Sequence, residues 1–481
     1  MPSKDKVIEF AFTLLVAGFC LVMLVWWRAR DIDLPGPALA GRDGAGNRSE
    51  KIQTVKVGSD FEKFSELTEA EKAQKFSDWP RFRNSDFSNL AEFDGELDFN
   101  LENSKLLWKL KLGEGYAAAV VWQNRVYILD YDEKLEADSL RVFSLADGRE
   151  LWRRYYKLKI RRNHGKSRTV ASVQNGKVLT FGPLGHLMCA DAISGDLLWA
   201  KDLTAEFGAE IPQWYAGQCP LIDGDCAVIG IGGKEVLLAG FDLNTGKMLW
   251  KVDNSLKIKM SHSSVMKMEF FGKPQYVYCG IGGIVGISAD KADAGTLLWS
   301  CDTWRPNVFA PSPVKISDSQ IFLTAGYGAG GAILSLAQDS GKFSAKILKS
   351  WKAKQGAACE QQTPIVFKNR LLTILPKDAG GNNSLMAVCD IQSDCKIIST
   401  SPRDTRFGIG PYMAVNDKIL VLDDNGILTV LDMEGDSLKI SSRKKVLPGA
   451  DSWGPMAFSS GLLLLRDSTE LVCLDLRKQK K

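Results

Sequence analysis

Phe241–Trp250 reads FDLNTGKMLW, and the pattern of this short stretch decides the fold. Apolar residues at both ends predict the end of one β-strand and the start of the next. Gly246 lies between them and accepts the positive φ angle that a tight hairpin turn requires. The side chain of Asp242 favours the same turn by bonding nearby backbone, and Trp250 supplies a large surface for burial.

The same pattern recurs along the chain. Related stretches are Phe143–Trp152 (FSLADGRELW), Cys189–Trp199 (CADAISGDLLW) and Ile287–Trp299 (ISADKADAGTLLW). The turn glycines are separated by 47, 51, 49 and 46 residues and stand at Gly148, Gly195, Gly246, Gly295 and Gly341. Repeats of this length, with short strands at even spacing, predict an all-β closed or radial fold.

Counting the repeats predicts an eight-bladed β-propeller with four-stranded blades. Five repeats follow from the turn glycines, and three more end near Asp390–Lys396, Leu431–Gly435 and Cys473–Leu476. The last repeat lacks its fourth strand, and Leu106–Trp108 (LLW) at the start of the domain matches the missing piece. We expect this strand to close the ring, because closure removes free sheet edges. Seven blades is the alternative count.

An apolar segment precedes the repeats. Val7–Trp27 contains 21 residues with one charge, Glu9, and this composition predicts an uncleaved transmembrane helix. A cleaved signal peptide is the alternative, although the small residues of Ala38–Ala40 lie well beyond the apolar run. Positive charges flank the segment on both sides, so its orientation stays open. We expect a single-pass protein of the cell membrane with the propeller on the periplasmic or extracytoplasmic side, since long domains translocate largely regardless of charge.

The sequence predicts four segments. The stretch after the apolar run is rich in Gly, Pro, Ala and charge, which indicates a flexible tether. Thr68–Glu71 then fits a helix capping box. The expected organisation is a transmembrane anchor (1–30), a flexible linker with a short helix (31–77), a lead-in segment (78–104) and the propeller (105–477).

Composition argues against several functions. The net charge of +4 over 481 residues, without a strong basic patch, argues against nucleic acid as a partner. Only three histidines are present, and the ten cysteines form no CxxC pair, so most are expected to be small buried residues. Cys389 and Cys395 flank a predicted hairpin turn, and a disulfide between them is a candidate if the domain is exported. No Walker A loop, HExxH motif or GxSxG motif occurs.

The repeats resemble the PQQ-like (pyrroloquinoline quinone) β-propeller family. The resemblance is carried by units of the form Asp-x-x-x-Gly-x-x-x-Trp, which are complete at Asp191, Gly195, Trp199, Asp242, Gly246 and Trp250. Asp78–Arg83 (DWPRFR) also resembles the lead-in of many bacterial members. The resemblance covers about residues 78–477 and implies the propeller fold.

The family implies two kinds of function. Its quinoprotein dehydrogenases hold PQQ and Ca²⁺ on the propeller axis, and its non-catalytic members include the scaffold lipoprotein of the outer-membrane β-barrel assembly machinery. A dehydrogenase of this type would carry adjacent cysteines, and this sequence has no Cys-Cys pair. We therefore expect a membrane-anchored, non-enzymatic scaffold that binds another envelope protein, a peptide or a ligand, without catalytic residues, metal or cofactor. The alternative is a divergent oxidoreductase dependent on PQQ and Ca²⁺, and a carbohydrate-binding propeller is a third possibility.

The tryptophans fall into two groups. Those at the repeat position are predicted to pack between blades, and they are Trp152, Trp199, Trp250 and Trp299. Others lie, with charged residues nearby, in loops that precede the first strand of a repeat. These loops predict a funnel mouth that contacts a ligand or partner through Trp214, Trp304, Arg305, Trp453, Glu210 and Glu360. Simple capping of the propeller core is the alternative interpretation of the same aromatic residues.

Overall fold

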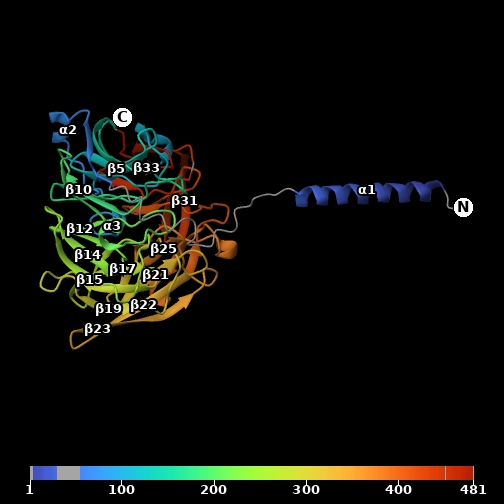
Figure 1. Cartoon of the computed structure of the whole chain (residues 1–481). Helices are drawn as coiled ribbons and strands as arrows, with labels where there is room; N and C mark the ends of the chain where they lie inside the picture. Colours follow the sequence, from blue (N-terminus) through green and yellow to red (C-terminus); the bar gives the residue numbers. More distant parts are fainter. Residues whose placement is uncertain (1–3, 30–54, 450, 480–481) are drawn as a thin grey trace. The chain divides into compact units, whose positions relative to one another are not determined.

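The computed structural model describes residues 4–29, 55–449 and 451–479, and in the first of these ranges it describes the side chains of residues 10 and 12–26. The chain divides into two units, Met1–Val55 and Lys56–Lys481. The second unit is an all-β propeller with eight sheets, drawn in Figure 1. The prediction of eight blades is therefore confirmed.

The first unit contains one helix, α1 (Lys4–Ala29), within its described residues. The apolar side chains described in α1 are exposed. No helix in the described part of the chain is long and apolar enough to span a bilayer, so the transmembrane character predicted for Val7–Trp27 is not shown. Most of the predicted tether lies outside the described residues.

The blades are numbered here in chain order. Blade 1 contains β4 (Val120–Trp122), β5 (Arg125–Asp132), β6 (Ala137–Ser144) and β7 (Glu150–Lys157). Blade 2 contains β8 (Ser172–Gln174), β9 (Lys177–Phe181), β10 (His186–Asp191) and β11 (Leu197–Asp202). Blade 3 contains β12 (Leu221–Asp223), β13 (Cys226–Gly230), β14 (Val236–Asp242) and β15 (Met248–Asp253). Blade 4 contains β16 (Met266–Phe270), β17 (Lys273–Gly280), β18 (Gly283–Ser288) and β19 (Leu297–Cys301).

The second half of the ring has the same plan. Blade 5 contains β20 (Val314–Ser317), β21 (Gln320–Ala325), β22 (Gly330–Asp339) and β23 (Lys342–Trp351). Blade 6 contains β24 (Ile365–Phe367), β25 (Arg370–Ile374), β26 (Met386–Asp390) and β27 (Lys396–Thr400). Blade 7 contains β28 (Tyr412–Val415), β29 (Lys418–Leu422), β30 (Ile427–Glu434) and β31 (Ser437–Lys445). Blade 8 contains β32 (Ala457–Ser459), β33 (Leu462–Arg466), β34 (Glu470–Asp475) and β3 (Lys105–Lys111).

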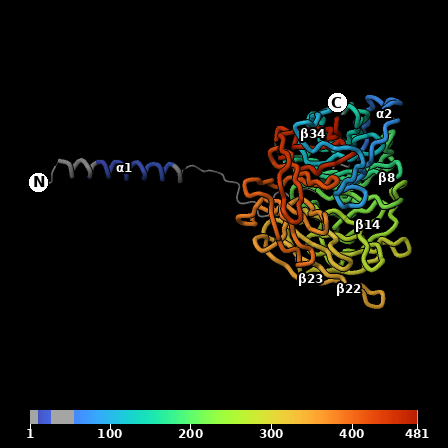
Figure 2. Tube along the Cα trace, turned by 180° about the vertical axis from the view of Figure 1, so that it is seen from behind, coloured from blue at the N-terminus to red at the C-terminus, as the bar shows by residue number. Residues whose placement is uncertain are grey.

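Blade 8 closes the ring with strands from both ends of the domain. β3 pairs antiparallel with β34, and Leu106 lies opposite Leu474 in this register. Figures 1 and 2 both show the blue start of the propeller beside its red end. The closing strand predicted at Leu106–Trp108 is thus confirmed. β3 thus completes the four-stranded sheet of blade 8 and makes β34 an interior strand rather than an edge.

The chain docks on the propeller earlier than the boundary predicted at residue 78. β1 (Asp60–Lys63) pairs antiparallel with β7 and adds a fifth strand to blade 1. α2 (Glu69–Ala73) begins with the predicted capping box at Thr68, and Asn124 Nδ2 donates to the Glu71 carbonyl at 2.8 Å. Composition could not show this docking, because a strand that adds to a sheet edge gains its stability from backbone hydrogen bonds. The remaining short elements are β2 (Leu90–Ala91), η3 (Leu101–Asn103), α3 (Leu203–Phe207), η4 (Gly380–Asn382) and η5 (Ile391–Ser393).

Each turn glycine of the early blades receives a tryptophan from the blade before it. Gly246 has φ 68°, and a Cβ at this position would lie 2.7 Å from the ring of Trp199. Trp199 belongs to blade 2 and Gly246 to blade 3, and Trp199 Nε1 donates to the Leu243 carbonyl of blade 3 at 2.9 Å. Trp152 lies on Gly195 and Trp250 on Gly295 in the same way.

Two further tryptophans extend or vary this arrangement. Trp108 on the closing strand lies on Gly148 of blade 1, although sequence analysis did not single it out for packing. Trp299 donates from Nε1 to Gln275 Oε1 of its own blade at 2.7 Å, and its ring lies in a buried cluster with Leu323 and Leu334 of blade 5. The buried core of the propeller therefore lies between neighbouring sheets, where residues of both are removed from water.

A segment that precedes the closing strand crosses the axis of the ring. We name residues 77–93 the lead-in strap. First strands of neighbouring blades contact one another, as strands that converge on an axis do. The strap touches the first strand, or the residues just before it, in several of these blades. Trp79 bridges Val121 of blade 1, and the Pro80 carbonyl accepts from the Val173 amide of blade 2 at 2.7 Å.

The strap then reaches the far side of the ring. Arg81 donates to the Ile222 carbonyl of blade 3 at 3.0 Å, and Arg83 donates to the Thr363 carbonyl before blade 6 at 2.8 Å. β2 pairs with β28 of blade 7, and the Ser77 carbonyl accepts from Ser459 of blade 8. Blades 2 and 3 lie opposite blades 6 and 7 in an eight-membered ring. The strap therefore passes over one end of the central channel.

Candidate functional site

A pocket of about 280 Å³ lies on the propeller axis. Each of the eight connections between the outer strand of one blade and the inner strand of the next contributes to its wall. Each connection supplies at least one lining residue, and in chain order these include Tyr116, Arg168, Trp214, His262, Val308, Thr363, Ile409 and Trp453. Only the axis is close to all eight connections, so we name this cavity the axial pocket.

The lead-in strap closes the inner end of the axial pocket. Phe82 lines the cavity, and the adjacent Arg83 is 5% exposed. Arg83 Nη2 donates to the Pro364 carbonyl at 2.9 Å, just beyond the wall residue Thr363. Burial lowers the pKa of Arg83 to about 10. The strap thus supplies part of the pocket and also fixes the position of one wall.

Two groups of stacked rings flank the cavity. Trp214 stacks with His262 (ring centroids 6.2 Å apart) and with Tyr327 (5.7 Å). On the other side, Tyr116 packs against Trp453 with centroids 5.0 Å apart, and the Arg168 guanidinium lies 5.4 Å from the Tyr116 ring. These rings come from connections that are far apart in sequence. They give the pocket rigid aromatic sides.

Several residues at the pocket have backbone conformations that are unusual for their type. Positive φ angles occur at His164 (52°), Trp214 (66°) and Tyr327 (54°). Tyr215 (71°) and Asp451 (53°) are immediate neighbours of the pocket with the same property. This region is disfavoured for bulky side chains, and such strain concentrates at functional sites. Four separate loops therefore carry residues in this disfavoured backbone conformation at or beside the axial pocket.

The polar groups of the pocket have perturbed protonation equilibria. Burial lowers the pKa of Arg168 to about 10. Burial, and then the positive charge of Arg168, lower the pKa of His262 to about 4, so this imidazole is neutral at pH 7. Burial, followed by the charge of Asp451, raises the pKa of Tyr116 to about 12. The pocket therefore combines two basic side chains, Arg168 and Lys377, and one acidic side chain, Glu360, with the neutral hydrogen-bonding groups of Tyr116 and His262.

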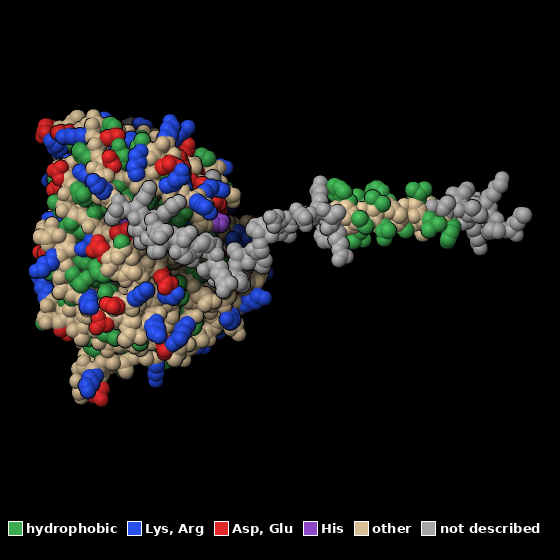
Figure 3. All heavy atoms as spheres, viewed as in Figure 1, with side chains coloured by type: hydrophobic (Ala, Val, Ile, Leu, Met, Phe, Trp, Pro, Cys, Tyr) green, Lys and Arg blue, Asp and Glu red, His purple; other side chains and the backbone are tan. Residues whose placement is uncertain are grey.

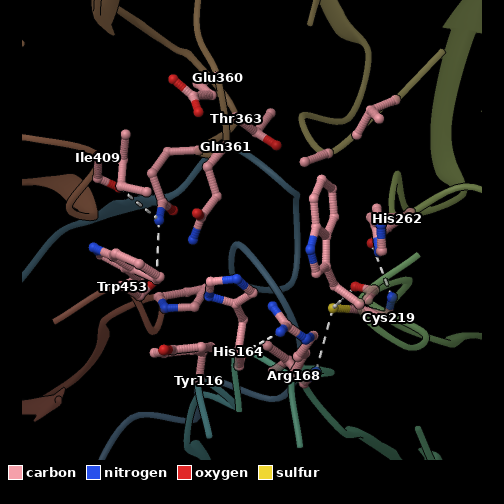
Figure 4. Close-up of a pocket in the computed structure, with 18 of the residues that line it drawn as sticks. Tyr116, His164, Arg168, Cys219, His262, Glu360, Gln361, Thr363, Ile409 and Trp453 are labelled. Atoms are coloured by element: carbon pink, nitrogen blue, oxygen red, sulfur yellow. Dashed lines mark hydrogen bonds between the residues drawn. The ribbon is translucent and has the colours of Figure 1, made fainter. Parts of the chain in front are cut away.

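Three of the six predicted funnel residues lie at this site. Trp214, Trp453 and Glu360 line the axial pocket. Figure 4 shows Glu360 and Trp453 around the cavity, with Glu360 on the side away from Arg168. Trp453 is held by its Nε1, which donates to Asp424 Oδ1 at 2.8 Å.

The other three predicted residues do not line the pocket. Trp304 packs edge-on against Phe309 with ring centroids 5.4 Å apart. Glu210 forms an exposed ion pair with Lys259 at 2.6 Å. Arg305 is exposed and pairs with Asp302 in its own loop. All six residues lie in connections that precede the first strand of a blade, but a repeat pattern does not predict the direction in which each loop presents its side chains.

Sequence analysis missed Tyr116, His164, Arg168 and His262. One signal was present for two of them, because residues 157–168 read KLKIRRNHGKSR and carry many basic groups without an acidic one. This run connects β7 to β8 and delivers His164 and Arg168 to the pocket. No local pattern marks Tyr116 or His262, whose proximity depends on closure of the ring.

The disulfide considered for Cys389 and Cys395 is not formed in the structure. Both cysteines are free and buried. In the register of β26 with β27, Cys389 lies opposite Ile397, and Cys395 stands in the turn with φ 55°. The two cysteines are therefore not cross-strand partners.

The described residues do not assemble the ligand set of a calcium-bound quinone. Glu360 is the one carboxylate that lines the axial pocket, and Cys219 is its one cysteine. Among the residues that the structure describes, no group of three His, Cys, Asp or Glu side chains could hold a metal ion. Calcium in proteins takes six to eight oxygen ligands, with carboxylates prominent among them. The donor set thus does not fit PQQ with Ca²⁺.

Charge on the propeller surface is mixed. Figure 3 shows Lys and Arg interspersed with Asp and Glu on the face in view. Charged side chains of the propeller also pair locally, as in Arg162 with Glu114 at 2.6 Å and Lys166 with Glu133 at 2.6 Å. This face therefore presents no extended field of one sign.

Comparisons with known proteins agree with the fold. Residues 136–364 match the PQQ-like family described as "Outer membrane protein assembly factor BamB". BamB from Moraxella catarrhalis is similar over 77% of this chain and 99% of its own, at 12% identity and a TM-score of 0.52. No curated protein matches the chain.

Dehydrogenases also share this fold. The quinohemoprotein alcohol dehydrogenase ADHIIG from Pseudomonas putida HK5 is similar over 86% of this chain and 82% of its own, at 12% identity and a TM-score of 0.54. A europium-containing methanol dehydrogenase is similar over 84% of this chain and 90% of its own, at 12% identity and a TM-score of 0.56. At such low identity these likenesses show the fold alone.

Proposed function

Because the chain is a β-propeller of the PQQ-like family, we propose that it is a non-enzymatic scaffold that binds a ligand in its axial pocket. Fold alone does not select a function in this family, because function depends on the residues of the site. The observation that carries it is the axial pocket itself. All eight inter-blade connections build it, and bulky residues in strained conformations line it.

The composition of the pocket supports binding rather than catalysis. Ligand sites are concave, largely apolar and aromatic, with a few polar groups that orient the ligand. The axial pocket has this character, with Trp214 and Trp453 on its sides and Arg168 and Lys377 as its basic side chains. A nucleophile activated by a base within hydrogen-bond reach is not present among the described pocket residues. Cys219 is buried, and burial raises the pKa of its thiol to about 11, which disfavours the reactive thiolate.

Thermal denaturation against a panel of small molecules tests the proposal. We expect at least one compound to raise the melting temperature of the wild type, because a ligand that binds only the folded state stabilises it. Trp214→Ala should abolish the shift, whereas Trp304→Ala, which removes an aromatic residue from a similar loop outside the pocket, should retain it. A panel in which no stabilising compound depends on Trp214 would overturn the proposal.

The second candidate function is a divergent quinoprotein oxidoreductase. Its support is the likeness of the fold to the two dehydrogenases, and the donor set of the pocket counts against it. Titration calorimetry with PQQ, with and without Ca²⁺, separates the two functions. Saturable binding of PQQ that requires Ca²⁺ would favour the oxidoreductase. If the titration gives neither a heat of binding nor a shift in the PQQ spectrum, the oxidoreductase function is excluded.

The proposal also includes a location and a partner. We propose that the apolar segment Val7–Trp27 attaches the protein to the cell membrane, with the propeller on the extracytoplasmic side, where it contacts an envelope protein or peptide. The support is the length and low charge of this segment. Carbonate extraction should leave the full chain with the membrane and release a chain that begins at Lys56. Pull-down from gently solubilised membranes should recover a reproducible partner, and release of the full chain by carbonate would contradict the attachment.

A further inference from the structure

We infer that the axial pocket is built for a ligand with one carboxylate on an aromatic or apolar body, and that Arg168 is the partner of this carboxylate. The inference rests on the proposed ligand-binding function and specifies the class of ligand. Its starting point is a cation in the pocket that lacks a counter-ion among the described residues.

Arg168 differs from the buried Arg83 in how many of its guanidinium nitrogens form hydrogen bonds. Arg83 donates from Nε to the Phe87 carbonyl, from Nη1 to Thr363 and from Nη2 to Pro364, so all three nitrogens have partners. The hydrogen bonds described for Arg168 come from Nη2 alone, which donates to the carbonyls of residues 163–165. Arg168 Nε is buried and has no hydrogen-bond partner in the part of the chain that the structure describes.

An unpartnered donor on a part-buried cation is unfavourable. No Asp or Glu in the described ranges lies within ion-pair distance of Arg168. Buried donors are nearly always hydrogen-bonded, and buried charges are nearly always paired, because removal of an unpartnered polar or charged group from water is unfavourable. An anionic ligand would supply both the missing acceptor and the missing charge.

Two basic side chains, Arg168 and the exposed Lys377, and one acidic side chain, Glu360, line the axial pocket, so its charge balance favours a ligand with a single negative charge. Glu360 lines the wall opposite Arg168, since the connections that carry them join blades 1 and 2 and blades 5 and 6. Figure 4 shows the two residues on opposite sides of the cavity. A phosphate carries nearly two negative charges at pH 7 and would be repelled by Glu360. One carboxylate matches the one guanidinium in charge and in planar geometry.

The remaining walls suit an apolar or aromatic body. Val170, Val308, Ile409 and Pro455 line the cavity between the stacked rings. A volume of about 280 Å³ lies at the lower end of the range for ligand pockets. This space suits one aromatic ring with a short chain. Two sources offer that chemistry, a small aromatic acid and the carboxy-terminal residue of a peptide.

Matched pairs of ligands test the inference on the full wild-type chain. The first pair is phenylpropionate and phenylpropionamide, and the second is the peptide acetyl-Ala-Ala-Phe with a free or an amidated terminus. By titration calorimetry, each acid should bind about tenfold or more tightly than its amide, because only the acid forms a charge-assisted bond with Arg168. Binding of the small acid alone indicates a free metabolite, and tighter binding of the peptide acid indicates a chain terminus.

Variants of Arg168 test whether the preference for acid over amide depends on this residue. Arg168→Gln should remove the preference for acid over amide, and Arg168→Lys should retain part of it. Arg162→Gln is the control, because Arg162 lies in the same connection, is 78% exposed and does not line the pocket. Retention of the preference in Arg168→Gln would overturn the inference, as would equal binding of acid and amide or binding of neither.

These outcomes also separate the inference from the proposed function. If acid and amide bind equally and both require Trp214, the carboxylate assignment fails while the ligand-binding function stands. If no tested acid binds but a panel compound still stabilises the protein through Trp214, the ligand class is again wrong and the function again stands. If no panel compound depends on Trp214 either, both fail.

Discussion

Gly246 and Trp199 illustrate how single residues define the blades. The positive φ of the glycine makes the hairpin turn, and the missing side chain admits the indole of the preceding blade. Both requirements appear in the sequence at a fixed spacing, so the repeat could be recognised without a structure. Residues such as Arg168 and His262 carry no such spacing, because their neighbourhood exists only after the ring has closed.

At this scale we predict that Gly246→Ala destabilises the propeller more than Gly224→Ala. Both glycines have positive φ (68° and 61°), but a Cβ at Gly246 would meet Trp199 at 2.7 Å, whereas nothing lies within 4 Å at Gly224. The conformational cost of about 1 kcal/mol is common to both, and overpacking adds about 1–3 kcal/mol at Gly246. Urea denaturation measures the difference. Equal losses of unfolding free energy would show that the indole contact is easily relieved.

The lead-in strap is the element whose role was least accessible from sequence. DWPRFR could be recognised as a lead-in, yet its path follows from contacts with carbonyl groups on distant strands. Arg83 makes two of these contacts, with the Thr363 and Pro364 carbonyls just before β24, and it is buried without a carboxylate at ion-pair distance among the described residues. Backbone carbonyls have no signature in a sequence, so neither the strap nor its contribution of Phe82 to the pocket could be predicted.

We predict that Arg83→Lys lowers the unfolding free energy by roughly 1–3 kcal/mol. A lysine ammonium cannot reproduce the fork of the guanidinium, so at least two buried carbonyls lose a partner, at about 1–3 kcal/mol in total. Arg305→Lys is the matched control, because Arg305 is exposed and should change stability by less than about 0.5 kcal/mol. Chemical denaturation of both variants checks this. Similar small effects would mean that the strap is held without Arg83.

A buried polar contact joins β6 to β7 and faces blade 2. Tyr156 donates to Asp138 Oδ2 at 2.7 Å, Ser167 Oγ lies 3.5 Å from Asp138 Oδ1, and Tyr156 OH lies 3.3 Å from His186 Nδ1. Asp202 lies 3.6 Å beyond His186. Burial raises the pKa of Asp138 from 3.8 to about 6.

This shift predicts a pH dependence of stability. The folded protein keeps the Asp138 proton up to about pH 6, whereas the unfolded chain releases it near pH 3.8, so the stabilisation is complete below the lower value and is lost as the pH rises through the upper one. Asp138→Asn should remove this component of the pH profile, because the amide stays neutral. Asp318→Asn, at a 99% exposed position, should leave the profile unchanged. Thermal denaturation across this pH window tests the prediction. Parallel plots of melting temperature against pH for the wild type and Asp138→Asn would contradict it.

On the scale of the whole molecule, the ring and its closing strand were predictable and the pocket was not. The period of the turn glycines and the missing fourth strand of blade 8 are properties of the linear sequence. The axial pocket combines one or more residues from each of eight connections, and half of the residues chosen for it from sequence point elsewhere. Loop direction depends on local turns and on contacts with neighbouring blades, which a repeat pattern does not encode.

Closure predicts how truncation affects the propeller. A fragment that begins at Gly113 lacks β3, so it leaves β34 as an exposed sheet edge and should unfold at lower temperature and aggregate. A fragment that begins at Ser104 lacks the strap but keeps β3, and should remain monomeric. Size-exclusion chromatography and thermal denaturation compare them with a chain that begins at Lys56. Monomeric behaviour of the Gly113 fragment would show that closure is dispensable.

The path of the strap also determines when its contacts can form during synthesis of the chain. Ser77, Arg83 and Asn89 leave the ribosome early, but their hydrogen-bond partners follow 382, 280 and 323 residues later. Contacts so distant in sequence form slowly, because a long loop of chain must be ordered before they are made. The strap is thus synthesised before the whole propeller, and its contacts are expected to be among the last to form. Until translation is nearly complete, the strap therefore lacks its hydrogen-bond partners in blades 7 and 8, and the end of the central channel that it crosses stays uncovered in the nascent protein.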